Sequence, residues 1–230
     1  MSDQTYDATT RFSGAKWFNF PQDIVIGGVG GIGSPLAFIL SHYQHTLLMY
    51  DFDKVEIQNT GTQFYRKEQV GVKKVHALKD NLSYFNDCKN VMPIDEKFEP
   101  GSMVAPVAFA AFDKITPRRH LFETWRDQEG KKLIFIDGRL NLDSFEVYVV
   151  NTKERIKYYG DTCLPPEEFI PDLPCTTRQT PHMGWAIAAY MVEQFNRWLM
   201  NAAERMNYLE LPFKSYYNAT ANLWEYEYNI

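Results

Sequence analysis

Apolar runs and glycines follow one another near the start of the chain in the order of a βαβ unit. Residues 23–26 form a short apolar run, a glycine-rich stretch follows, and residues 35–41 have the character of a helix. Residues 46–50 form a second apolar run that ends at Asp51. Continuous apolar runs are typical of parallel strands that are buried on both faces. This order predicts a parallel sheet with a glycine-rich loop between its first strand and its first helix.

The rest of the chain continues the pattern. Val75, Leu78, Leu82 and Phe85 recur every three or four residues, which predicts an amphipathic helix over 72–85. We also expect buried strands at 107–112 and 133–136, helices at 117–127 and 183–206, a more exposed strand at 145–150, and edge strands within 213–228. The elements predict an α/β, Rossmann-like fold. Its sheet is mostly parallel, with helices on both faces and antiparallel strands toward the C-terminus.

Composition and charge narrow the class of protein. The 230 residues, 45% of them hydrophobic, fit a single domain over 1–230, with an N-terminal arm at about 1–20. Residues 152–182 are rich in proline and charge without a period, and we expect a crossover loop there. A net charge of −5 without a basic block disfavours nucleic acid and anionic membranes as partners. With no signal peptide, no membrane span and three cysteines, we expect a cytoplasmic protein with reduced thiols.

The glycine-rich loop predicts a nucleotide site. Gly28, Gly30 and Gly33 allow a sharp turn and a close approach of the backbone to phosphates, and the next helix directs its first N–H groups at them. Asp51, at the end of the second strand, can accept hydrogen bonds from ribose hydroxyls. The loop alone does not separate ATP from NAD.

A set of motifs favours ATP over NAD, because together they resemble the motifs of a known family. The stretch Gly28-Val-Gly-Gly-Ile-Gly-Ser34, with Gly31 as its extra glycine, comes first, and Asp51-Phe-Asp53-Lys-Val-Glu-Ile-Gln-Asn59 follows it. Gln63-Phe64 and Gly71-Val-Lys-Lys74 complete the set. Together they resemble the ThiF/MoeB family, whose adenylation fold is shared with the ubiquitin-activating enzymes. The resemblance covers about residues 11–205.

The resemblance implies a Mg-ATP site and roles for its residues. Asp51 would hold the ribose, Asn59, Gln63 and Lys74 would line the phosphates, and Asp53 would also belong to the cofactor-binding set. Asp113, which follows an apolar strand and precedes a helix, would help to bind Mg²⁺, with a helix N-cap as its alternative role.

The N-terminal arm and one departure from the family pattern bear on catalysis. Arg11 resembles a family arginine that reaches across a homodimer to the partner's ATP. Thr62 stands where the family has a phosphate-contacting arginine, which favours either weakened catalysis or a substitute cation from Arg66, Arg11 or Arg139.

Cys175 is the candidate nucleophile. It lies at the end of the long loop, just before the last helix, where relatives without a separate cysteine domain carry a thioester cysteine; packing is its alternative role. Cys88 and Cys163 are interpreted as structural.

The sequence therefore predicts an adenylyltransferase that uses Mg-ATP. Its substrate would be the C-terminal Gly-Gly of a small ubiquitin-like or sulfur-carrier protein, or a peptide, and Cys175 would then accept the acyl group. Two alternatives stay open. One is a catalytically impaired relative that binds nucleotide, and the other is an NAD-dependent oxidoreductase. The identity of the carrier is not encoded in any motif of the chain.

Overall fold

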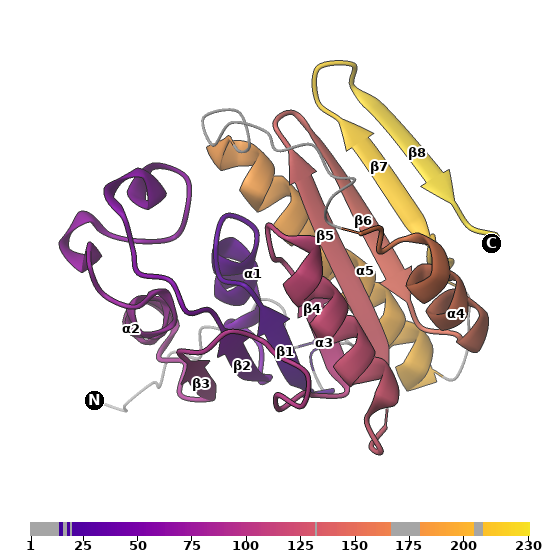
Figure 1. The fold of residues 1–230 in the computed structure, drawn as a ribbon, viewed down its shortest axis with the longest axis horizontal. Coiled ribbons are helices and arrows are strands. Elements are labelled where there is room, and N and C mark those ends of the chain that lie inside the picture. Colours follow the sequence, from indigo (N-terminus) through magenta and orange to yellow (C-terminus); the bar gives the residue numbers. More distant parts are fainter. Residues whose placement is uncertain (1–13, 16–17, 19, 132, 167–179, 205–208) are drawn as a thin grey trace.

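The fold is built on one mixed sheet. The computed structural model describes residues 14–15, 18, 20–131, 133–166, 180–204 and 209–230. Its strands form an eight-stranded sheet in the order β3-β2-β1-β4-β5-β6-β7-β8 (Figure 1). The strands are β1 (Asp23–Gly27), β2 (Thr46–Tyr50), β3 (Val91–Ile94), β4 (Val107–Ala110), β5 (Ile134–Asn141), β6 (Ser144–Val150), β7 (Lys214–Asn218) and β8 (Leu223–Glu227). Strands β3, β2, β1, β4 and β5 are parallel, and β6, β7 and β8 add in antiparallel pairs.

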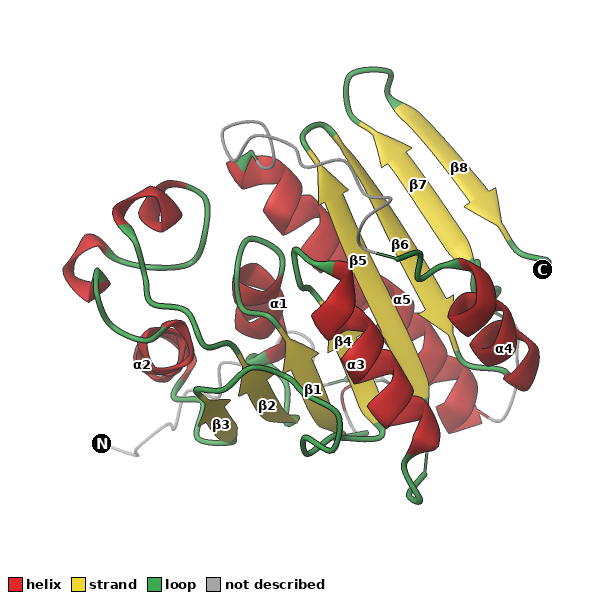
Figure 2. Ribbon diagram, viewed as in Figure 1, coloured by secondary structure: helices red, strands yellow, loops and turns green. Residues whose placement is uncertain are grey.

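Helices cover both faces of the sheet, as Figure 2 shows. On one face lie α1 (Gly33–Leu40), α2 (Lys74–Asn86) and α5 (Pro181–Glu204), and on the other lie α3 (Ile115–Asp127) and α4 (Lys153–Thr162). Two short 3-10 helices, η2 (Ile57–Gly61) and η3 (Lys67–Gln69), lie in the β2–α2 connection. In β1, Ile24 and Ile26 pack on the first face and Val25 on the second, which is why this strand is apolar throughout. The expected fold class is confirmed.

The strand order places a crevice beside β1. The chain runs from β1 outward to β2 and β3, and it then crosses back to β4 on the other side of β1. In such sheets, ligands bind outside the carboxyl ends of the strands at this change of direction. The glycine loop after β1, Asp51 after β2 and Asp113 after β4 therefore meet at one edge.

Several elements differ from the expectations. Strand β3 was not predicted, because it is a four-residue edge strand that contains Pro93. Strand β6 is mostly buried rather than exposed, since α5 packs against it. The expected loop 152–182 begins with helix α4, capped by Thr152, which accepts a hydrogen bond from the Arg155 N–H at 3.3 Å. Tyr159 is the one residue of α4 that is classed as buried, so the helix carries no apolar period.

Among the described residues, no helix combines the length and the apolar character that a membrane crossing would need.

Candidate active site

The glycine loop has the geometry of a phosphate-binding turn. Gly28 has a φ of +85°, and its N–H donates to the Tyr50 carbonyl at 2.9 Å. A Cβ at Gly33 would lie 1.8 Å from the Gly28 carbonyl oxygen, so no larger residue fits there. A Cβ at Gly30 would meet nothing within 4 Å, and the backbone there faces open space. Gly31 lies in the turn before α1, and the Ser34 N–H closes this turn on the Gly30 carbonyl at 2.9 Å.

Asp51 connects the glycine loop to the β2–α2 segment. One carboxylate oxygen accepts the Val29 N–H at 3.0 Å, and the other accepts the Asp53 N–H at 2.9 Å. Burial raises the pKa of Asp51, and the nearby Lys74 ammonium opposes that shift. Each carboxylate oxygen keeps a further lone pair for a ribose hydroxyl.

Lys74 is a positioned cation at the start of α2. It is 8% exposed, and its ammonium pairs with Asp53 at 3.0 Å. An ammonium has three donors, so this pair leaves capacity for phosphate oxygens. Its neighbour Lys73 turns elsewhere, to the Asp95 carboxylate at 2.9 Å and the Phe52 carbonyl at 2.7 Å. That Lys74 rather than Lys73 faces the nucleotide stays a prediction, and these contacts show only that Lys73 is engaged elsewhere.

Asn59 and Gln63 lie in the segment that docks onto the start of α1. Asn59 Oδ1 accepts the Glu56 N–H at 2.8 Å and so shapes η2. The Phe64 N–H donates to Ser34 Oγ at 3.0 Å, which ties this segment to the first turn of α1. Within the part of the chain that the structure describes, the buried Gln63 Oε1 has no hydrogen-bond partner. A buried amide oxygen without a donor is costly, and a ligand would pair it only through a donating group such as a hydroxyl, because phosphate oxygens accept.

Tyr65 belongs to the site, and sequence reasoning missed it. Its hydroxyl donates to the Val29 carbonyl at 2.6 Å, so Tyr65 and Asp51 both hold the glycine loop at Val29. Burial raises the pKa of Tyr65 well above its ordinary value, and the carboxylates of Asp51 and Asp53 add to the shift. The available signal was an aromatic residue two positions after Gln63, which alone does not indicate this contact.

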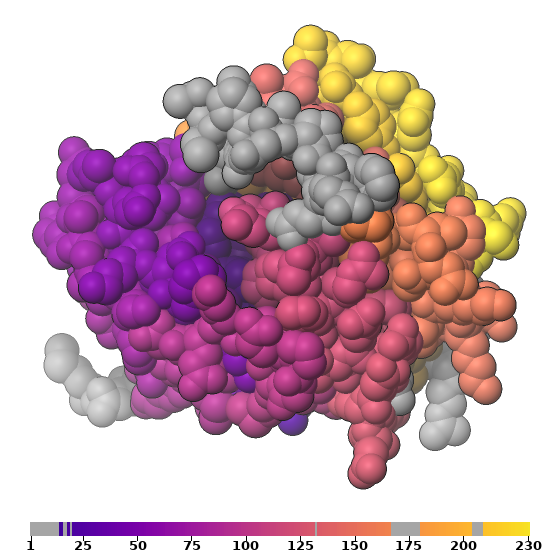
Figure 3. Space-filling view, in the orientation of Figure 1, coloured from indigo at the N-terminus to yellow at the C-terminus, as the bar shows by residue number. Residues whose placement is uncertain are grey.

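The surface is hollowed beside this cluster. In Figure 3, a hollow lies between the purple lobe of the β2–α2 connection and the pink loop that follows β4. Indigo atoms from the early part of the chain lie at its floor.

Asp113 lies on the loop between β4 and α3. Asp113 is exposed to solvent. The N-cap residue of α3 is Lys114, so Asp113 does not take the alternative role of an N-cap. No group of three or more His, Cys, Asp or Glu side chains suited to a metal occurs among the described residues. One carboxylate together with phosphate oxygens and water is nevertheless the usual donor set for Mg²⁺ at nucleotide sites. The residues present therefore fit a nucleotide-bound Mg²⁺ and do not form a protein cage.

The contacts of Arg139 and Arg66 bear on which of them could replace the arginine that the family has at the position of Thr62. Thr62 is the C-cap residue of η2 and brings no charge. Arg139 is engaged elsewhere, with the Asp137 carboxylate at 2.8 Å and the Cys163 carbonyl at 2.7 Å. Arg66 is exposed at the start of η3 and is not held by an ion pair among the described residues. Arg66 is therefore the less engaged of these two cations.

Two candidate residues lie outside the described residues, namely Arg11 and Cys175. The other cysteines are poor nucleophiles in this structure. Burial raises the pKa of both the Cys88 and the Cys163 thiol, which disfavours the thiolate. Their interpretation as structural residues agrees with this.

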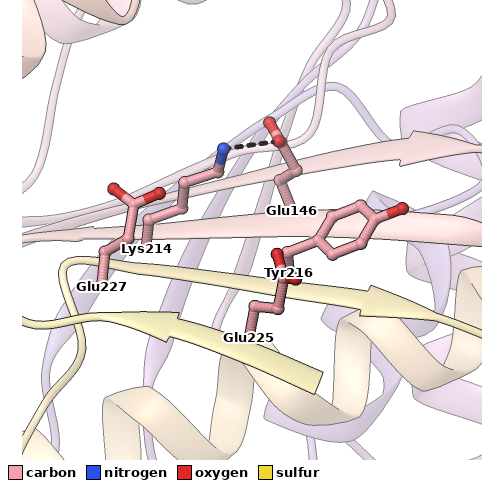
Figure 4. Close-up of a pocket in the computed structure, with 5 residues that line it drawn as sticks. All are labelled: Glu146, Lys214, Tyr216, Glu225 and Glu227. Carbon is pink, nitrogen blue, oxygen red and sulfur yellow. Dashed lines mark ion pairs between the residues drawn. The ribbon is translucent and has the colours of Figure 1, made fainter. Parts of the chain in front are cut away.

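A second concavity, of 230 Å³, lies away from the nucleotide loop, on β6, β7 and β8. It is lined by Glu146, Lys214, Tyr216, Glu225 and Glu227, and Lys214 pairs with Glu146 at 2.7 Å (Figure 4). Three carboxylates against one ammonium disfavour a triphosphate there. The pocket therefore gives no support to an alternative nucleotide site.

Comparisons with known proteins identify the class. The ThiF family profile matches residues 16–134, which is more than half of the chain, and the chain belongs to the ThiF family. This confirms the resemblance stated from the motifs.

Individual relatives match over shorter stretches. Ubiquitin-like modifier-activating enzyme 5 of Caenorhabditis elegans is 41% identical over 64 residues, or 27% of this chain. The same enzyme of Mus musculus is 34% identical over 97 residues, or 37% of this chain. The matches span 15% and 24% of these relatives' own lengths.

Solved structures share the fold over most of the chain. The E. coli MccB structure with ATP superimposes with a TM-score of 0.67 at 15% identity, over 93% of this chain and 64% of that one. The E. coli tRNA N6-threonylcarbamoyladenosine dehydratase TcdA gives 0.65 at 16% identity, over 86% of this chain and 94% of that one. At these identities the superpositions establish the common fold.

Proposed function

We propose that this chain is an ATP-dependent adenylating enzyme. It activates the C-terminal carboxylate of a small ubiquitin-like or sulfur-carrier protein with a Gly-Gly end, or of a peptide, in the cytoplasm. The observation that carries the proposal is the linkage of Asp51 to the glycine loop at 3.0 Å and of Asp53 to Lys74 at 3.0 Å. These contacts support the proposal, because they hold a carboxylate suited to a ribose and an ammonium suited to phosphates beside an open glycine turn. Relatives support this choice, since one is named an activating enzyme and another was crystallised with ATP.

The chemistry follows from positioning and charge. An oxygen of the substrate carboxylate attacks the α-phosphorus of ATP, the bond to the bridging β-oxygen breaks, and pyrophosphate leaves. Lys74 neutralises charge on the phosphates, and the side-chain amides of Asn59 and Gln63 donate to their oxygens. Asp113 would hold Mg²⁺, which supplies further charge neutralisation on the phosphates.

A second step is proposed for Cys175. Its thiolate attacks the acyl carbon of the adenylate, AMP leaves, and a thioester forms. The support is the position of Cys175 just ahead of α5 together with the raised thiol pKa values of Cys88 and Cys163. Mass spectrometry after incubation with Mg-ATP and small Gly-Gly proteins tests this step. An adduct should form on wild type and on Cys163→Ser, whereas its persistence on Cys175→Ser would contradict the assignment.

The proposed assembly is a homodimer in which Arg11 of each subunit completes the partner's nucleotide site. This would supply a guanidinium that Thr62 lacks. Mixing Arg11→Ala and Lys74→Met subunits tests the idea, because each mixed dimer would contain one intact site. Activity should recover to about a quarter of wild type after random reassociation. If Arg11 acts within its own subunit, no recovery is expected.

The decisive test is exchange of labelled pyrophosphate into ATP in the presence of candidate carriers. Lys74→Met should reduce exchange by about 100-fold or more, because charge neutralisation at the phosphates is lost. The matched control Lys73→Met removes the adjacent ammonium, which pairs with Asp95, and should change exchange less than about threefold. Equal losses in both variants would contradict the assigned role of Lys74.

Thr62 favours one alternative, a catalytically impaired relative that binds nucleotide. ATP binding without pyrophosphate exchange with any carrier would support that alternative. Stabilisation by NADH and not by Mg-ATP in a thermal-shift assay would instead support an oxidoreductase.

A further inference from the structure

Arg118, on α3, carries a guanidinium buried between β5 and the loop that presents Asp113. The residue is 4% exposed, and burial is the largest cause that lowers its pKa, to about 9. The group is still protonated at neutral pH. A buried charge is tolerated only with well-placed partners, so its contacts indicate its role.

The contacts of Arg118 join two separate segments. One terminal nitrogen donates to the Gly138 carbonyl at 3.2 Å and forms an ion pair with the Asp137 carboxylate. The other terminal nitrogen donates to the Phe112 carbonyl. A single rigid guanidinium therefore fixes the loop after β4 to the middle of β5.

Phe112 transmits this constraint to the nucleotide loop. Its ring packs so closely against the glycines that a Cβ at Gly27 would lie 2.4 Å from it and a Cβ at Gly28 would lie 3.2 Å from it. Phe112 also directly precedes Asp113 in the chain. The carbonyl that Arg118 holds therefore belongs to the residue that both covers the glycine loop and sets the direction of Asp113.

We propose that Arg118 is a positioning residue for the Mg²⁺ site: it holds Phe112, and through it directs the Asp113 carboxylate toward the triphosphate. The inference rests on the proposed function, because it takes Asp113 as the magnesium ligand. Lysine is not equivalent at this position, since one ammonium on a flexible stem does not reproduce the planar fork that spans these acceptors.

The Asp137 carboxylate also accepts hydrogen bonds from residues other than Arg118. A variant can therefore remove the Arg118–Asp137 ion pair and keep these other contacts. Its second oxygen accepts from Arg139 Nε at 2.8 Å and from the Tyr159 hydroxyl at 2.7 Å. Removing Arg118 alone would leave the buried charge of Asp137 imperfectly paired. The paired variant Arg118→Met/Asp137→Asn removes both charges and leaves an amide oxygen for Arg139 and Tyr159. We expect it to fold, with a far-UV and near-UV circular dichroism spectrum like that of wild type.

The experiment is a Mg²⁺ titration of the full chain in the presence of a non-hydrolysable ATP analogue. Calorimetry measures the binding of the analogue at each Mg²⁺ concentration. The paired variant should raise the half-saturating Mg²⁺ concentration by about 10-fold or more, as is typical when a residue supporting a metal ligand is lost. Binding of the analogue in EDTA should change less than about threefold, because Asp51 and Lys74 are untouched. Arg155→Met is the matched control. This arginine is also partly buried and donates to the Leu211 carbonyl at 2.9 Å, so its loss should leave Mg²⁺ dependence unchanged.

A second comparison separates positioning from a general loss of structure. Asp113→Asn should raise the Mg²⁺ requirement similarly, and combining it with the paired variant should add little, because both changes act on one ligand. Full additivity would overturn the inference, as would a folded paired variant with wild-type Mg²⁺ dependence. Should the paired variant not fold, Arg118→Lys serves the same titration, and an unchanged Mg²⁺ requirement there refutes the idea. If wild type itself binds the analogue without regard to Mg²⁺, the proposed function fails together with this inference.

Discussion

His45 provides a test of the structure through pH. The residue is 2% exposed and lies directly before β2. Its Nδ1 accepts the Gln22 N–H at 3.1 Å, and its buried Nε2 has no partner among the described residues. Protonation would put a proton on Nδ1, facing the Gln22 donor, in an apolar setting beside Phe195. Burial accordingly lowers the pKa of His45 from 6.5 to about 4.

The sign and size of the effect follow from linkage. Because the unfolded chain binds the proton more readily, the free energy of unfolding rises with pH between about 4 and 6.5. The contribution of His45 is fully present above that window and is lost as the pH falls through it. A shift of this size corresponds to about 3 kcal/mol, of which most is lost between pH 7.5 and pH 4.5.

The measurement is urea unfolding of wild type and His45→Asn across this range. Asparagine keeps an acceptor near Nδ1 but does not titrate. The variant should be less stable than wild type at pH 7.5. Between pH 7.5 and pH 4.5, its free energy of unfolding should fall by about 2–3 kcal/mol less than that of wild type. His76→Asn, which replaces an exposed histidine on α2, should follow the wild-type pH dependence. Parallel curves for wild type and His45→Asn would refute the reasoning.

Further predictions concern the candidate nucleotide site. Gly33→Ala should abolish ATP binding in a fluorescence titration, because its Cβ would lie 1.8 Å from a carbonyl oxygen, while Gly130→Ala, whose new Cβ would lie 3.4 Å from the end of the Gln128 side chain, should bind as wild type does. Tyr65→Phe should lower stability by about 1 kcal/mol in urea and weaken ATP binding several-fold, through the lost bond to the glycine loop; unchanged affinity would contradict that role. Asp51→Asn should weaken ATP binding by about 10-fold, because charge-assisted bonds are replaced by neutral ones; affinity equal to wild type would exclude Asp51 from the site.

The β2–α2 segment lacks one positive charge that the family has at its nucleotide site. Thr62 brings no charge to a position where the family has an arginine, and Arg139 is committed to Asp137 and Cys163. A charge-assisted contact contributes about 1.5–3 kcal/mol, so its absence would slow turnover without preventing nucleotide binding. Comparing Arg66→Ala with Arg11→Ala in pyrophosphate exchange would show which cation, if either, substitutes.

Local patterns in the sequence determined the order of the early elements, and they predicted most residues of the candidate nucleotide site. The apolar runs, the glycine spacing and Asp51 each act over a few neighbouring residues, and the structure places β1, the loop, α1 and β2 as they predict. The family match covers the same part of the chain, residues 16–134.

Other features became visible only in the tertiary structure. Strand β3 and helix α4 were missed because neither carries a sufficient apolar period of its own, and packing against distant elements stabilises them. Tyr65 reaches a carbonyl 36 residues away, and Arg118 reaches one 20 residues away. Such contacts depend on which strands become neighbours in the sheet. Spacing along the chain therefore predicted which residues bind the nucleotide, whereas the folded sheet decided which residues hold them in place.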